Sequence, residues 1–112
     1  YKQRYCPANY KQFDQEMAEL SSFLDSCSKK GIKVVLINMP VSSGHKSISP
    51  PGLRKAYLAG LAKLSEKAAL YLDYEAKQYP NSYFFDTVHL SPKGASDFAD
   101  SVAEKLAGSG LL

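Results

Sequence analysis

Apolar residues recur along the chain with two different periods, and their alternation predicts an α/β fold. From Phe13 to Cys27 they fall three and four residues apart, as on one face of a helix, and Gly31 is suited to end that helix. Residues 32–38 are then almost continuously apolar and rich in β-branched side chains, which is typical of a buried parallel strand. A helix that passes through one glycine into a buried strand indicates an α/β architecture.

The same pattern returns after a long polar segment. Residues 39–52 are rich in Pro, Ser and Gly, so we expect a loop at the carboxyl end of the strand. A second helix is expected over 51–67, and the apolar run 69–73, which ends in Asp, favours a second strand. A third amphipathic helix is expected from Ser91 to Gly108. The predicted order is α-β-α-β-α with a short parallel sheet.

Composition narrows the classes of function. The chain has 112 residues, which suffices for one domain, and its 45% hydrophobic and 22% charged residues are ordinary for a globular protein. The net charge of +3 comes from basic residues scattered among acidic ones, so we expect no nucleic-acid-binding face. No segment approaches the roughly 18 consecutive apolar residues of a membrane span.

The two cysteines, Cys6 and Cys27, lack the spacing of zinc ligands. Cys27 continues the apolar face of the first helix, so we expect a buried thiol there. Cys6 could pair with it only in an oxidising compartment. The cysteines therefore leave the compartment open.

The segment with the strongest candidates for catalytic side chains is 84–94, Phe-Phe-Asp-Thr-Val-His-Leu-Ser-Pro-Lys-Gly. Ser91 is a good N-cap and Pro92 fits a first helical turn, so the Asp and His lie in the loop that leads into a helix. In a tight loop, Asp86 can accept a hydrogen bond from one ring nitrogen of His89, which leaves the other nitrogen able to take a proton from a nucleophile. The alternative is that Asp86 only caps the turn and His89 is an ordinary polar loop residue.

Three more polar side chains are candidates to line a site, because their loop leaves the carboxyl end of a strand, where open α/β sheets bind ligands: Ser42, Ser43 and His45. A solvated loop is the favoured interpretation. Ser42 or Ser43 as a nucleophile is disfavoured, since a nucleophile elbow needs small residues around a sharp strand-to-helix turn and here a proline lies upstream. A metal site of Asp86, His89 and His45 is also disfavoured, because it has only three ligands on two loops. We expect neither metal nor cofactor.

Aromatic residues crowd the segment before the Asp/His pair: Tyr71, Tyr74, Tyr79, Tyr83, Phe84 and Phe85. They could wall a pocket, or their rings could cover a small core. The sequence leaves both interpretations open.

Asp-x-x-His followed by Leu-Ser-Pro-x-Gly and an amphipathic helix resembles the last sequence block of SGNH, or GDSL-type, serine hydrolases. The resemblance covers about residues 13–106 and includes 31–41, which looks like a late central strand ending in Pro. It implies part of a flavodoxin-like three-layer fold in which Asp86 orients and His89 acts as the base of a Ser-His-Asp triad on a small acyl ester. The pattern looks most like the SGNH-type proteins of bacterial envelopes, including the D-alanyl-transfer and alginate-acetylation groups. That grouping implies an extracytoplasmic location.

The sequence departs from this family where the nucleophile is concerned. Neither the family's Gly-Asp-Ser block nor the Gly-x-Asn of its oxyanion hole occurs in the chain. We therefore expect residues 1–112, with 1–10 as a lead-in segment, to form a single domain that is the C-terminal part of a longer SGNH hydrolase-like protein. Such a chain would supply the acid and the base of an ester hydrolase or acyltransferase, and it would be inactive alone. The alternative is a non-catalytic interaction domain of the same fold. Unpaired strand edges also predict self-association.

Overall fold

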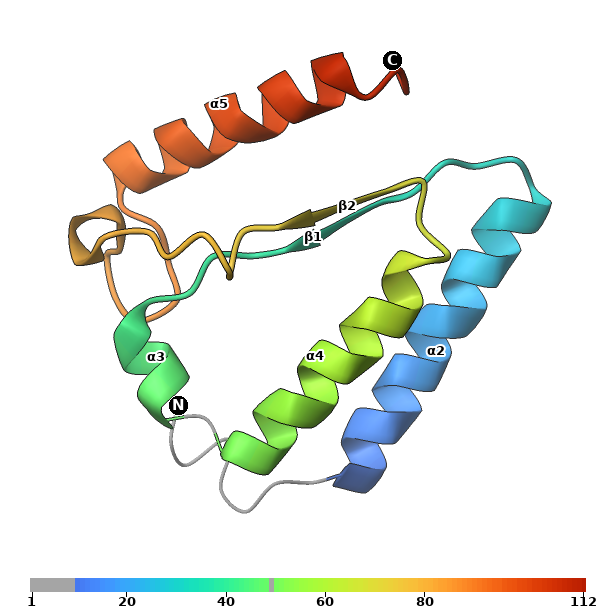
Figure 1. Ribbon diagram of the computed structural model, residues 1–112, viewed down its shortest axis with the longest axis horizontal. Helices are drawn as coiled ribbons and strands as arrows, with labels where there is room; N and C mark the ends of the chain where they lie inside the picture. The colour runs from blue at the N-terminus through green and yellow to red at the C-terminus, as the bar shows by residue number, and fades with distance from the viewer. Residues whose placement is uncertain (1–9, 49) are drawn as a thin grey trace. The chain divides into compact units, whose positions relative to one another are not determined.

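A computed structural model describes residues 10–48 and 50–112 (Figure 1). The elements in order are α2 (Tyr10–Lys29), β1 (Val35–Asn38), α3 (Ser43–Ile48), α4 (Pro51–Ser65), β2 (Leu70–Asp73), the 3-10 turn η1 (Asn81–Tyr83) and α5 (Pro92–Gly108). β1 and β2 form a two-stranded parallel sheet. The α/β class and the α-β-α-β-α order with a short parallel sheet are confirmed. Most of the expected lead-in segment, and Cys6 with it, lies outside the described residues.

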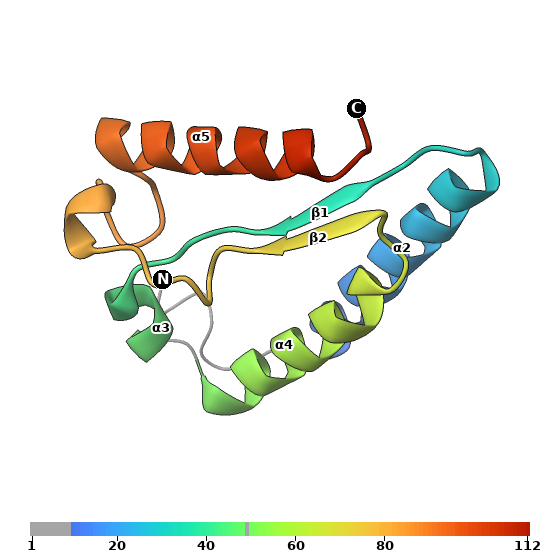
Figure 2. The same ribbon diagram turned by 45° about the horizontal axis from the view of Figure 1, so that its top comes forward.

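The chain divides into two compact units, one of Tyr1–Leu36 with Ile48–Leu72 and one of Ile37–Ser47 with Asp73–Leu112. In the first unit α2 and α4 lie side by side (Figures 1 and 2). Gly60 of α4 lies against Met17 of α2, since a Cβ added at Gly60 would lie 2.4 Å from Cε, the flexible end of the Met17 side chain. The buried side chains of the two helices are Leu24, Cys27, Leu61 and Leu64, and the first two belong to the apolar face predicted from Phe13 to Cys27. The expected buried thiol at Cys27 is confirmed.

The first helix ends as predicted, but the strand after it is shorter and less buried than expected. Gly31 has a φ of +74°, and the N–H of Ile32 donates to the carbonyl of Cys27 at 2.9 Å. Ile32 itself is 54% exposed, and only Asn38 of the four β1 residues is buried. The reason is that, within the described part of the chain, β1 has one neighbouring strand, so a continuous apolar run is not enclosed on both sides.

The loop expected over residues 39–52 is interrupted by the short helix α3, and this is a correction. Ser42 immediately precedes α3, and its Oγ accepts a hydrogen bond from the N–H of His45 at 3.2 Å, which is the capping interaction that begins a helix. Ser42 and His45 are buried, whereas Ser43 is exposed. The interpretation as a solvated loop is therefore wrong at Ser42 and His45.

The second unit has Tyr74 at its centre. Tyr74 is fully buried, its N–H donates to the carbonyl of Asn38 at 2.9 Å, and its hydroxyl lies 2.8 Å from the Oγ of Ser101 on α5. Its ring meets that of Phe98 edge-on at 4.9 Å and that of Tyr79 at 6.3 Å. These rings pack on one another, which favours the interpretation that the aromatic residues cover a core.

None of the helices among the described residues is both long enough and apolar enough to cross a membrane.

Candidate functional site

The Asp/His segment forms a tight loop closed by main-chain hydrogen bonds. Phe84 and Leu90 pair as an antiparallel bridge, and the N–H of Phe85 donates to the carbonyl of His89 at 2.7 Å. The four residues from Asp86 to His89 are thus held between two paired chain segments. A loop closed in this way has few alternative conformations, so its side chains are held in place before any ligand arrives.

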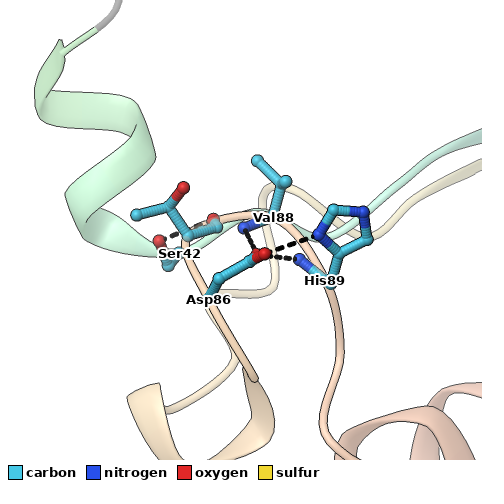
Figure 3. A network of polar contacts seen from close by, with 5 residues as sticks. Ser42, Asp86, Val88 and His89 are labelled. Carbon is cyan, nitrogen blue, oxygen red and sulfur yellow. Dashed lines mark hydrogen bonds and ion pairs between the residues drawn. The ribbon is translucent and has the colours of Figure 1, made fainter. Parts of the chain in front are cut away.

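Asp86 organises this loop with both of its carboxylate oxygens (Figure 3). Oδ1 accepts from the backbone N–H groups of Val88 at 2.8 Å and of His89 at 2.7 Å. Oδ2 lies 2.7 Å from Nδ1 of the His89 ring, which is the hydrogen bond that the sequence predicted. Asp86 therefore caps the turn and orients the imidazole at once, so the two interpretations of this residue are compatible.

The same hydrogen bonds lower the pKa of Asp86 from 3.8 to about 2. The largest contribution is the backbone N–H of Val88, followed by the backbone N–H and then the ring of His89. Each of these donors stabilises the ionised carboxylate. Asp86, whose side chain is 41% exposed, therefore stays ionised at neutral pH and down to about pH 2.

An ionised carboxylate can only accept hydrogen bonds, so Nδ1 of His89 must be the donor. In the neutral ring the proton then resides on Nδ1, and Nε2 carries a lone pair. Figure 3 shows the second ring nitrogen pointing away from Asp86. The His89 side chain is 67% exposed, and no described residue is hydrogen bonded to Nε2. The ring can therefore take a proton from a group brought to its outer edge.

Ser42 contacts this loop, but its hydroxyl is hydrogen bonded to the main chain and not to the imidazole of His89. The carbonyl of Thr87 accepts from the N–H of Ser42 at 3.2 Å and from its Oγ at 2.7 Å. The hydroxyl proton of Ser42 thus points at a main-chain oxygen, and a nucleophile needs that proton to face the base. The structure supports the inference that Ser42 is not the nucleophile.

The other two candidates from the same segment do not join the Asp86–His89 pair. Ser43 is exposed at the start of α3. His45 is buried in that helix, and its backbone N–H donates to the Oγ of Ser42. In the part of the chain that the structure describes, no three His, Cys, Asp or Glu side chains gather as a metal site.

The start of α5 is hydrogen bonded to the chain that precedes the Asp86–His89 loop. Ser91 caps the helix as predicted, since its Oγ accepts from the N–H of Gly94 at 3.2 Å. The N–H of Ser91 donates to the carbonyl of Tyr83 at 2.7 Å. Gly94 packs directly on Tyr83, because an added Cβ would lie 2.1 Å from the Tyr83 carbonyl oxygen. Sequence reasoning found the cap but missed this close approach; the Gly at the third position after the cap was the available signal.

A buried polar cluster at the carboxyl ends of the two strands was also missed. The Nδ2 of Asn38 donates to Oδ1 of Asp73 at 3.0 Å and to Oε2 of Glu75 at 3.3 Å. Asn38 and Glu75 are both buried, and the Nζ of Lys46 donates to the carbonyl of Glu75 at 2.9 Å. The signal in the sequence was a polar residue at the end of each apolar run. This cluster joins the end of β1 to the chain that follows β2.

Comparison with known proteins identifies the family. The chain matches the family model described as DltD protein over residues 1–104, a range that includes the whole Asp86–His89 loop and most of α5. No curated protein and no solved structure matches the chain. The match covers far more than half of the sequence and agrees with the resemblance to SGNH-type envelope proteins. The chain therefore belongs to the DltD protein family, a family of SGNH-like envelope proteins of acyl transfer.

Proposed function

We propose that this chain supplies the acid and the base of a Ser-His-Asp triad that transfers an acyl group in the D-alanylation of teichoic acids. The DltD family is involved in that modification. The observation that carries the proposal is the 2.7 Å hydrogen bond from His89 Nδ1 to Asp86 Oδ2, which leaves Nε2 able to accept a proton. Asp86 is the orienting acid and His89 is the base.

In this role His89 acts twice. Nε2 first takes the proton of a serine hydroxyl as the serine oxygen bonds to the acyl carbon, and it then gives that proton to the departing group. It next takes a proton from the acceptor hydroxyl as that oxygen bonds to the acyl carbon, and it returns this proton to the serine oxygen as the serine leaves. Asp86 stays ionised throughout because its pKa is about 2, and its charge stabilises the imidazolium that forms in each step.

The nucleophile and the oxyanion donors come from residues beyond these 112. No Gly-Asp-Ser or Gly-x-Asn occurs in the sequence, and the hydroxyl of Ser42 is bound to Thr87. A base without a nucleophile does not catalyse acyl transfer. The 112-residue chain is therefore an inactive half of the site, and the complete protein acts on a small acyl ester outside the cytoplasm.

Serine-directed fluorophosphonate labelling, read by mass spectrometry, tests the proposal. The chain is compared with one extended upstream until it includes a Gly-Asp-Ser block, and His89→Ala and Asp86→Asn are made in both. We expect labelling of the extended chain alone, abolished by His89→Ala and slowed about 10⁴-fold by Asp86→Asn. Asp100→Asn is the matched control, since Asp100 is an exposed carboxylate on α5.

Two results would contradict the proposal. Labelling of the short chain at Ser42 or Ser43 would show that the nucleophile is local. If neither chain is labelled, the hydrolase interpretation fails and the non-catalytic interaction domain takes its place. One observation favours that second function: Phe85, next to Asp86, is 82% exposed, and exposed aromatic residues are common at binding surfaces.

A further inference from the structure

We infer that Ser42 is the positioning residue of the Asp86–His89 loop, because its hydroxyl holds the peptide group between Thr87 and Val88. The catalytic consequence of this inference rests on the function proposed above, but the structural role of Ser42 does not. Ser42 is only 7% exposed and lies 45 residues before Thr87 in the sequence.

The hydroxyl of Ser42 has both a donor and an acceptor role. It donates to the carbonyl of Thr87 at 2.7 Å and accepts from the N–H of His45 at 3.2 Å (Figure 3 shows the contact with the loop). Because the acceptor role fills one lone pair and the donor role directs the proton, the hydroxyl has a single orientation. The loop is thereby tied to the first turn of α3 at one atom.

The Thr87–Val88 peptide group carries this effect to Asp86. Its carbonyl is held by Ser42, and its N–H donates to Oδ1 of Asp86 at 2.8 Å. A trans peptide group is planar, with its C=O and N–H pointing in opposite directions. Fixing the carbonyl therefore aims the N–H at the carboxylate. Hydrogen bonds at the two ends of one peptide group also polarise each other.

This N–H is the largest cause of the low pKa of Asp86. If the hydroxyl of Ser42 is removed, the bond that remains to the Thr87 carbonyl among the described residues is the longer one of 3.2 Å from the N–H of Ser42. The Thr87–Val88 peptide group can then rotate, so the N–H of Val88 is less well aligned with Oδ1 of Asp86. The ionised form of Asp86 is stabilised less as a result. The orientation of His89 loosens with it, since the same carboxylate holds the ring.

The test is a carboxyl ¹³C NMR titration of Asp86 in the full 112-residue chain. We expect Ser42→Ala to move the pKa of Asp86 from about 2 toward its ordinary value of 3.8, and Ser42→Thr, which keeps the hydroxyl, to restore it. Ser47→Ala is the matched control, because Ser47 belongs to α3 and its hydroxyl donates to the Gly44 carbonyl within that helix. If Ser42→Ala does not fold, Ser42→Cys keeps the volume with a much weaker donor, and the same rise is expected.

An unchanged pKa of Asp86 in a folded Ser42→Ala or Ser42→Cys chain would overturn the inference, as would an equal rise in Ser47→Ala. Labelling of the extended chain separates this outcome from that of the proposed function. If the pKa rises but no wild-type chain is labelled, the positioning role stands and the acyl-transfer function fails. If labelling depends on His89 but the pKa does not move, the function stands and the role of Ser42 fails.

Discussion

At the scale of the residue, Asp86 is the most strongly determined side chain of the site. Three hydrogen bonds converge on its carboxylate, and all three come from residues within three positions of it. Such a turn is local, so Asp-x-x-His in a tight loop was enough to predict the contact with His89. What the Asp/His spacing could not predict is the size of the effect on the pKa, because the largest donor is a main-chain N–H rather than the ring.

The low pKa of Asp86 predicts how stability depends on pH. The folded-state pKa of about 2 lies below the ordinary value of 3.8, so between these values the unfolded chain binds more protons. The stabilisation is therefore complete above about pH 4 and is lost as the pH falls through about 2. We expect the urea midpoint of the wild type to exceed that of Asp86→Asn at pH 6 and the difference to be much smaller at pH 2, where about half of the folded molecules still have Asp86 ionised. A difference of the same size at pH 2 as at pH 6 would mean that the charge of Asp86 is not its source.

At the scale of the element, the first residue of α5 is determined by its immediate neighbours in the sequence. The packing of the helix depends on residues farther away along the chain. Ser91 and Pro92 are start signals that act within one turn, and the structure confirms both. The contact of Gly94 with the Tyr83 carbonyl depends instead on how η1 and the paired loop fold back on the helix. The sequence shows that a glycine stands in the first turn of the helix, but it does not show which group packs against that glycine.

Gly94→Ala tests this packing. The added methyl group would overlap the Tyr83 carbonyl, which is main chain and cannot rotate away, so α5 or η1 must shift. Overpacking of this kind costs about 1–3 kcal/mol. Gly108→Ala is the control, since a Cβ there meets open space and alanine favours a helix by up to about 1 kcal/mol. Urea unfolding should show a loss of stability for the first and none for the second. Equal stabilities would show that the contact is looser than described.

At the scale of the whole molecule, the described chain leaves large apolar side chains uncovered. Phe23, Ile32 and Met39 are each at least 50% exposed, and among the described residues each of the two strands pairs on one side alone. Free edges and exposed apolar groups favour association with another chain. We propose that residues 1–112 self-associate when expressed alone.

Analytical ultracentrifugation over a range of concentrations measures this association. We expect the sedimentation coefficient to rise with concentration and Ile32→Lys to reduce the rise, because the change replaces an exposed apolar side chain near the start of β1 by a charged one. Leu112→Lys serves as the control, since Leu112 is more exposed and does not adjoin a strand in the sequence. A coefficient that stays constant at the monomer value would refute self-association.

The sequence by itself determined the three long helices, the order of the strands, the cap at Ser91 and the Asp86–His89 hydrogen bond. The helices and strands follow from the local spacing of apolar residues, and the cap and the hydrogen bond join groups three residues apart, which meet whatever the rest of the chain does. The sequence misassigned residues 39–52 and the burial of β1, because a short capped helix and the number of neighbouring strands both depend on partners elsewhere.

Only the tertiary structure decided which distant groups support the site. The bond from Ser42 to Thr87 joins residues 45 positions apart, and that from Asn38 to Asp73 joins residues 35 apart. No periodicity or spacing records such pairs, because they form only after the strands have brought distant segments of the chain together. The serine that sequence reasoning weighed as a nucleophile thus proves to be a hydrogen-bond partner of the loop, and the folded chain alone shows this.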